Sequence, residues 1–167
     1  KDIELRGDAA VRDLSAKFDN YTPASFKLSQ TEIEGLIASL SDRELADIKF
    51  AQEQVRNFAQ AQRDSMLDIE VETMPGVILG HKNIPVQSVG CYVPGGKFPM
   101  VASSHMSVGT ATVAAVPRII SFPPPFTGYP HHAVTAAINL GAAYEFHSVL
   151  RIQASGATVI CIHTIQH

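Results

Sequence analysis

The sequence has few of the features that give a small protein an obvious class. Its 167 residues include no tryptophan and only two cysteines, Cys91 and Cys161. Two cysteines cannot build a disulfide scaffold, so we expect a reducing compartment, the cytoplasm. No apolar run reaches the roughly 18 residues of a membrane span, and the charged start at residues 1–5 lacks the apolar stretch of a signal peptide. We therefore expect no membrane partner.

Carboxylates are almost missing from the second half of the chain. Residues 1–74 hold 15 aspartates and glutamates against nine lysines and arginines, whereas residues 75–167 hold only Glu145 against four basic residues. A stretch with one carboxylate has no acidic pair for acid–base catalysis and few ligands for hard metal ions. The net charge of −3 argues against a nucleic-acid partner. The change in composition near Met74 predicts two parts, a region 1–74 and a region 75–167.

The acidic region 1–74 has the patterns of helices. Residues 8–18 place Val11 and Phe18 on one apolar face at helical spacing. The stretches 29–32 and 41–44 are both capping-box sequences, in which a serine and a glutamate exchange bonds with each other's backbone amides. These patterns predict three helices and therefore a helical N-terminal region.

Strand and helix signals alternate in the region 75–167. We expect strands at 90–93, 118–122 and 145–150, separated by helices from Ser103 or Ser104 to about Val116 and from His131 to Gly141. The β-α-β-α-β order implies parallel strands joined by right-handed crossovers. The fold class expected is α/β, with the helical region followed by an incomplete Rossmann-like parallel sheet.

A glycine-rich turn lies between the first of these strands and the helix after it. Pro94, Gly95 and Gly96 precede Lys97. Adjacent glycines allow a close approach of the backbone to a ligand and a positive φ, and a helix N-terminus favours an anion such as a pyrophosphate. The Gly-x-Gly-x-x-Gly fingerprint is absent, so a purely structural turn stays an alternative.

The late histidines raise the question of a metal. His163 and His167 are four residues apart, with Cys161 nearby, and would share one face of a helix. A closed zinc site needs about four ligands, and no Cys-x-x-Cys or His-Glu-x-x-His pattern accompanies them. No metal ligand is therefore predicted in this chain.

The remaining candidates have simpler interpretations. His131 and His132 follow a proline, where helix capping or surface exposure is expected rather than metal ligation. His105 lies near the start of a helix expected to be buried, as a satisfied core histidine or as a pocket residue. Cys91 lies within an expected strand and fits a small core residue.

The stretch 90–99, Gly-Cys-Tyr-Val-Pro-Gly-Gly-Lys-Phe-Pro, resembles the Tyr-Val-Pro-Gly-Gly signature of the histidinol dehydrogenase family. The similarity continues through 112–116 and 118–120, and residues 6–11 resemble that family's N-terminal helical region. Residues 79–86 are more similar to the sulfopropanediol dehydrogenase branch. The resemblance implies an NAD-dependent, zinc-assisted dehydrogenase that oxidises an alcohol to an acid. Its substrate would be a small molecule, a sulfonated diol or histidinol, and the protein a homodimer.

The resemblance also assigns roles to residues. Tyr92 matches the family's NAD-contacting tyrosine, with Pro94, Gly95 and Gly96 beside it, and an ungapped reading places Gln153 on a second NAD-contacting position. The family's zinc ligands and Glu-His base pair lie beyond the matched region, so we expect no catalytic residue here and an inactive N-terminal fragment. The alternative is a truncated, non-catalytic paralogue that acts as a binding or oligomerisation module, because a sheet cut short leaves an unpaired edge.

Overall fold

The N-terminal region is helical, as predicted. The computed structural model describes residues 2–95, 98–143 and 145–148. The helices are α1 (Asp2–Arg6), α2 (Asp8–Asp19), α3 (Gln30–Ala38) and α4 (Asp42–Asp64). Both predicted capping boxes form: Ser29 caps α3 and exchanges bonds with Glu32, and Ser41 caps α4 and exchanges bonds with Glu44.

The apolar face predicted for α2 is only partly correct. Val11 is buried, together with Ala10 and Ser15. Phe18, however, is 58% exposed, with the Lys17 ammonium 5.2 Å from the centre of its ring. The helix ends one residue later, and Asn20 adopts a left-handed conformation as its C-cap. The spacing of apolar residues therefore identified the helix but not the limit of its buried face.

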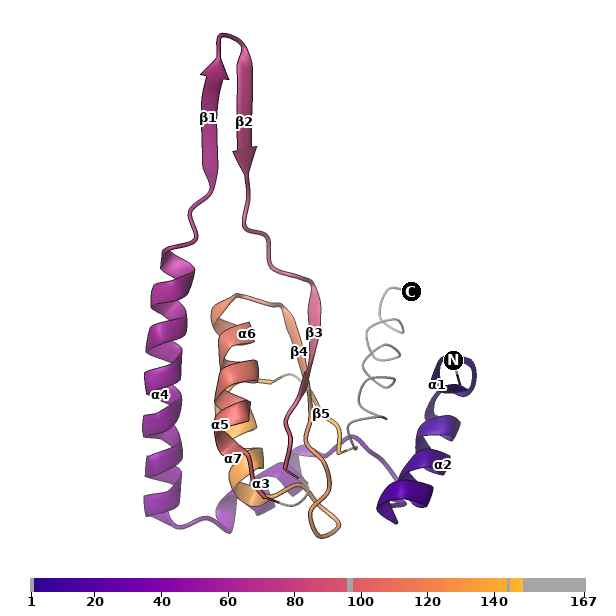
Figure 1. Cartoon of the computed structure of the whole chain (residues 1–167). Coiled ribbons are helices and arrows are strands. Elements are labelled where there is room, and N and C mark those ends of the chain that lie inside the picture. The colour runs from indigo at the N-terminus through magenta and orange to yellow at the C-terminus, as the bar shows by residue number, and fades with distance from the viewer. Residues whose placement is uncertain (1, 96–97, 144, 149–167) are drawn as a thin grey trace.

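An antiparallel hairpin follows α4 and projects from the rest of the molecule (Figure 1). It consists of β1 (Ile69–Met74) and β2 (Val77–His81), with Val71 opposite Leu79. The turn between them contains Gly76, whose φ of 80° is a conformation that glycine adopts without strain. The change in composition near residue 74 falls where β1 ends and this turn begins, and the division into two regions stays a prediction.

The second region contains the predicted parallel sheet. Its strands are β3 (Ser88–Tyr92), β4 (Arg118–Phe122) and β5 (Glu145–Phe146), in the order β3-β4-β5. A helical segment connects β3 to β4; it consists of α5 (Val101–Ser104), a π-helical turn η1 (His105–Gly109) and α6 (Thr110–Val113). The helix α7 (His132–Leu140) connects β4 to β5. The α/β class and the parallel sheet are therefore confirmed.

The start of the first connecting helix differs from the prediction. The helix begins at Val101, and Met100 occupies the N-cap without a side-chain capping bond. Ser104 is buried inside the helix, and the Ser107 hydroxyl donates to the Ser103 carbonyl at 2.6 Å. Val101 packs against the neighbouring apolar clusters, which favours a helix that starts before the two serines.

The sheet has helices on both faces (Figure 1). Successive residues of a strand point to opposite faces, and β4 shows this: Ile119 packs with Val108 and Ile138 of the helix layer, whereas Ile120 and Phe122 pack with Val11 and Phe26. The long helix α4 covers the outer side of α7 through Ile48. None of the helices in the described part of the chain combines the length and apolarity needed to cross a membrane.

Candidate cofactor site

Tyr92 is the last residue of β3, at the carboxyl end of the sheet. It is partly buried and lies opposite Phe122, the last residue of β4. Val93 follows in the core with no exposed surface, and its backbone N–H donates to the Phe122 carbonyl at 3.3 Å. Both strands therefore end at the same level, and the loop after β3 leaves from this edge. Ligands of open α/β sheets bind outside the carboxyl ends of the strands.

Pro94 and Gly95 begin that loop and are both partly buried. Gly95 does not adopt a positive φ. A Cβ at this position would meet the Phe98 carbonyl oxygen at 3.7 Å, an ordinary contact, so the fold itself does not require a glycine here. Gly96, Lys97 and the second predicted cofactor residue, Gln153, lie outside the described residues. Of the predicted cofactor residues, the structure thus brings together Tyr92, Pro94 and Gly95.

Among the described residues β3 is an edge strand, and it forms one wall of a cavity of about 610 Å³. The other walls come from Arg63 at the end of α4, from Met66 after it, and from η1 and α6. Cys91 is part of the lining but only 6% exposed, and burial raises the pKa of its thiol to about 11. The thiol is therefore protonated at neutral pH, and its burial agrees with the prediction of a small core residue.

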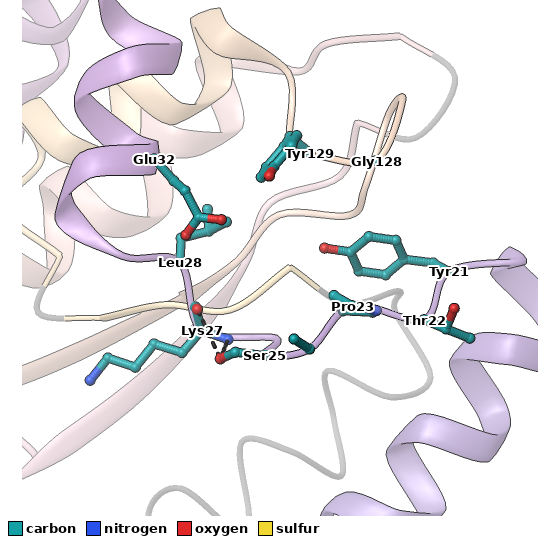
Figure 2. Close-up of a pocket in the computed structure, with 10 residues that line it drawn as sticks. Tyr21, Thr22, Pro23, Ser25, Lys27, Leu28, Glu32, Gly128 and Tyr129 are labelled. Carbon is teal, nitrogen blue, oxygen red and sulfur yellow. Dashed lines mark hydrogen bonds between the residues drawn. The ribbon is translucent and has the colours of Figure 1, made fainter.

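A second cavity, of about 400 Å³, lies where the α2–α3 loop meets the loop after β4 (Figure 2). Tyr21 and Tyr129 project toward this space from opposite sides, with Glu32 of α3 nearby. Hydrogen bonds from the Ser29 backbone and side chain hold the pKa of the Glu32 carboxyl below its usual range. Sequence reasoning missed this cavity because its walls are about 100 residues apart in the chain.

Glu145, the single late carboxylate, joins three basic side chains. Its carboxylate oxygens lie 3.0 Å from Lys27 Nζ, 3.0 Å from His147 Nε2 and 3.6 Å from Arg118. Burial alone would raise the pKa of Glu145, but hydrogen bonds from His147 and Lys27 and their charges outweigh it and lower the pKa. The cluster ties the α2–α3 loop to β4 and β5, so we assign it to the fold.

His105 is 1% exposed, and neither ring nitrogen has a hydrogen-bond partner in the described structure. It is therefore buried as predicted, but not as a satisfied core histidine. Burial lowers its pKa below 6.5, so the ring is neutral at physiological pH.

This burial makes a testable prediction for stability. The unfolded chain takes up the His105 proton first, so the free energy of unfolding should fall as the pH drops from about 6.5. Urea unfolding at several pH values should show that the free energy of unfolding of His105→Leu depends less on pH below 6.5. At neutral pH this variant should be about 1 kcal/mol more stable, because an unsatisfied polar group is removed. Exposed His81→Gln is the matched control. Equal pH slopes for His105→Leu and the parent chain would contradict the prediction.

No metal ligand was predicted in this chain, and this stays a prediction. Residues 2–95, 98–143 and 145–148 contain no group of three or more histidine, cysteine, aspartate or glutamate side chains able to hold a metal. Zinc therefore does not fit these residues. His131 caps α7, its Nδ1 accepting from the Ala133 N–H at 3.2 Å, as the capping interpretation predicts. Cys161, His163 and His167 lie outside the described residues.

These observations define the class of the protein: an α/β domain with a parallel sheet whose β3 and β4 end together at an aromatic pair, Tyr92 and Phe122. Comparison with known proteins identifies the family. The family model described as histidinol dehydrogenase matches residues 1–167. The chain belongs to the histidinol dehydrogenase family.

Three relatives and one solved structure show the extent of the similarity. The chain is 53% identical to a histidinol dehydrogenase homolog of Shouchella clausii (98% of this chain, 39% of the relative). It is 46% identical to the sulfopropanediol 3-dehydrogenase of Ruegeria pomeroyi (76% and 29%) and 33% identical to the histidinol dehydrogenase of Methanosarcina mazei (98% and 38%). The crystal structure of histidinol dehydrogenase from Elizabethkingia anophelis superposes with a TM-score of 0.84 at 28% identity, over 93% of this chain and 36% of that one. The chain thus spans well under half of the proteins it matches.

Proposed function

We propose that this chain forms the NAD-binding part of a dehydrogenase that oxidises an alcohol to an acid. The observation that carries the proposal is the position of Tyr92, Pro94 and Gly95 at the carboxyl end of β3, followed by a helical segment without a side-chain cap. The N–H groups at such a helix start favour anions such as the phosphates of a dinucleotide. Bound NAD would accept the hydride, and these residues would position it.

For the substrate we propose a sulfonated diol, with histidinol as the alternative. The support is the higher identity to the sulfopropanediol 3-dehydrogenase of Ruegeria pomeroyi, 46%, than to the histidinol dehydrogenase of Methanosarcina mazei, 33%. Because zinc does not fit the described residues, we place any zinc and the catalytic base elsewhere in the complete enzyme. A cytoplasmic location stays a prediction from the two cysteines.

Calorimetric titration of chain 1–167 with NAD tests the cofactor proposal. Tyr92→Ala should weaken binding about tenfold, because a base or ring stacked on an aromatic side chain contributes about 1–3 kcal/mol, and Tyr92→Phe should retain most of the affinity. Phe50→Ala, at an exposed position of α4, is the control. Unchanged NAD affinity in a normally folded Tyr92→Ala variant would overturn the proposal.

The projecting hairpin favours a second role, self-association. Ile69, Val71, Val77 and Leu79 lie on one face of it, because they alternate with the other residues along each strand and Val71 lies opposite Leu79. Each is at least 42% exposed. A two-stranded hairpin is marginally stable alone, and an uncovered apolar face of this kind is typical of an interaction surface. We propose that a second copy of the chain covers it in a homodimer.

Light scattering during gel filtration tests this role. Val71→Thr with Leu79→Thr keeps residues that favour strands but removes apolar surface, and it should shift chain 1–167 from dimer toward monomer. Glu70→Thr, on the opposite face of the hairpin, should leave the mass unchanged. A parent chain that is monomeric at tens of micromolar would exclude the dimer.

A further inference from the structure

The cavity between Tyr21 and Tyr129 lies beside the proposed cofactor site. Tyr21 and Tyr92 pack against the same buried cluster, which contains Phe26 and Phe122. The loop that carries Tyr129 follows β4 as the loop with Pro94 follows β3, so both leave from the carboxyl edge of the sheet. The inference that follows rests on the proposed function, because it concerns another part of the same ligand.

The wall that contains Tyr21 is held in place by several bonds. The Ser15 hydroxyl donates to the Tyr21 carbonyl at 2.7 Å. The Arg12 guanidinium donates to the carbonyls of Pro23 and Ala24 at 2.8 and 2.9 Å. The Tyr21 ring also contacts the buried Phe26 ring, with 6.2 Å between centroids. The ring is therefore positioned before any ligand arrives, which lowers the entropic cost of binding.

The opposite wall is shaped by a tight turn. Gly128 has a φ of 87°, which side-chain-bearing residues rarely adopt. The Phe126 N–H donates to the Tyr129 carbonyl at 2.8 Å and closes the loop. Tyr129 remains 47% exposed and projects toward the cavity (Figure 2). Two tyrosine rings thus border one space of about 400 Å³, a volume in the range of small-molecule pockets.

The polar groups of the cavity select a type of ligand. In the capping box, Oε2 of Glu32 accepts both Ser29 bonds, each at 2.7 Å, and these bonds lower the pKa of the carboxyl. The Tyr129 side chain also hydrogen-bonds to this carboxyl, and an ionised carboxylate has further acceptor positions beyond these bonds. Lys27, the nearby cation, is paired with Glu145 at 3.0 Å. The site therefore offers an acceptor to N–H donors and flat aromatic surfaces to a planar ring.

We propose that this cavity binds an amino-bearing heteroaromatic ring, the adenine base of the dinucleotide whose other half lies at Tyr92. The base would stack on Tyr129 and Tyr21, and its exocyclic amino group would donate to the Glu32 carboxylate. This arrangement assigns the two halves of the cofactor to two aromatic positions on one edge of the sheet.

Separate titrations of chain 1–167 with AMP and with nicotinamide mononucleotide test the assignment. Tyr129→Ala should weaken the binding of AMP about tenfold and leave the binding of nicotinamide mononucleotide unchanged. Glu32→Gln keeps a capping-box residue and should weaken AMP severalfold. Phe126→Ala, in the same loop but outside the lining, is the matched control and should change neither.

The outcomes distinguish this inference from the proposal on which it rests. If AMP affinity depends on Tyr129 whereas the affinity for nicotinamide mononucleotide is unchanged by Tyr92→Ala, the assignment of adenine to this cavity stands and the cofactor assignment at Tyr92 fails. If mononucleotide affinity depends on Tyr92 but AMP affinity is unchanged by Tyr129→Ala and Glu32→Gln, the assignment of adenine to this cavity fails. The adenine assignment also fails if AMP does not bind at millimolar concentration to a chain that has a native circular-dichroism spectrum.

Discussion

Replacing Phe122 by alanine should lower the free energy of unfolding by about 3–5 kcal/mol, the range measured for buried phenylalanines. Phe122 ends β4 with no exposed surface, and its ring packs against Val11, Phe26 and Ile120. The substitution removes apolar contacts and leaves a cavity between the sheet and the N-terminal helix. Because native domains are stable by only about 5–15 kcal/mol, this loss is a large fraction of the total stability.

Urea unfolding followed by circular dichroism at 222 nm measures this loss. Phe50→Ala in α4 is the matched control, since Phe50 is 64% exposed and its truncation should cost less than about 0.5 kcal/mol. If the two variants lose similar stability, the cluster around Phe122 is not the core that joins α2 to the sheet. Phe122→Leu should recover about half of the loss, because part of the volume is restored.

The fold was predictable where local chemistry determines structure. Both capping boxes formed because a serine and a glutamate three residues apart satisfy free amides regardless of the rest of the chain. The strand at Arg118–Phe122 has the predicted bounds. The prediction was wrong for the buried face of α2 at Phe18 and for the helix start at Val101, because long-range packing outweighs local preference there. The π-helical turn at His105–Gly109 has no signal in the periodicity.

The candidate site was predictable only in part. The signature placed Tyr92, Pro94 and Gly95 at a strand end, and the structure shows that this end is the carboxyl edge of a parallel sheet. The cavity between Tyr21 and Tyr129 could not be found from the sequence, since no motif joins them and the fold alone brings the two segments together. His105 was correctly expected in the interior, but its lack of a partner depends on neighbours that a sequence pattern does not specify.

The carboxylate-poor composition of the second region has its clearest consequence at Glu145. Replacing Glu145 by glutamine should lower the free energy of unfolding by about 2–3 kcal/mol, because charge-assisted hydrogen bonds are lost where the partners are largely shielded from water. Arg118 and His147 are 16% and 15% exposed, and both lie within 3.6 Å of the Glu145 carboxylate. Residues 75–148 hold no other carboxylate to replace it.

The pH dependence separates this effect from a simple packing change. The folded structure lowers the pKa of Glu145, so its contribution is present above the unfolded-state value of about 4.5 and is lost as the pH falls through the lower folded-state pKa. The parent chain should therefore lose stability more steeply than Glu145→Gln below about pH 4.5. Glu53 is an exposed carboxylate on α4, and Glu53→Gln should lose stability with falling pH as steeply as the parent chain. Parallel slopes for the parent chain and Glu145→Gln would mean that the cluster does not stabilise the fold by charge, and that the single late carboxylate is replaceable.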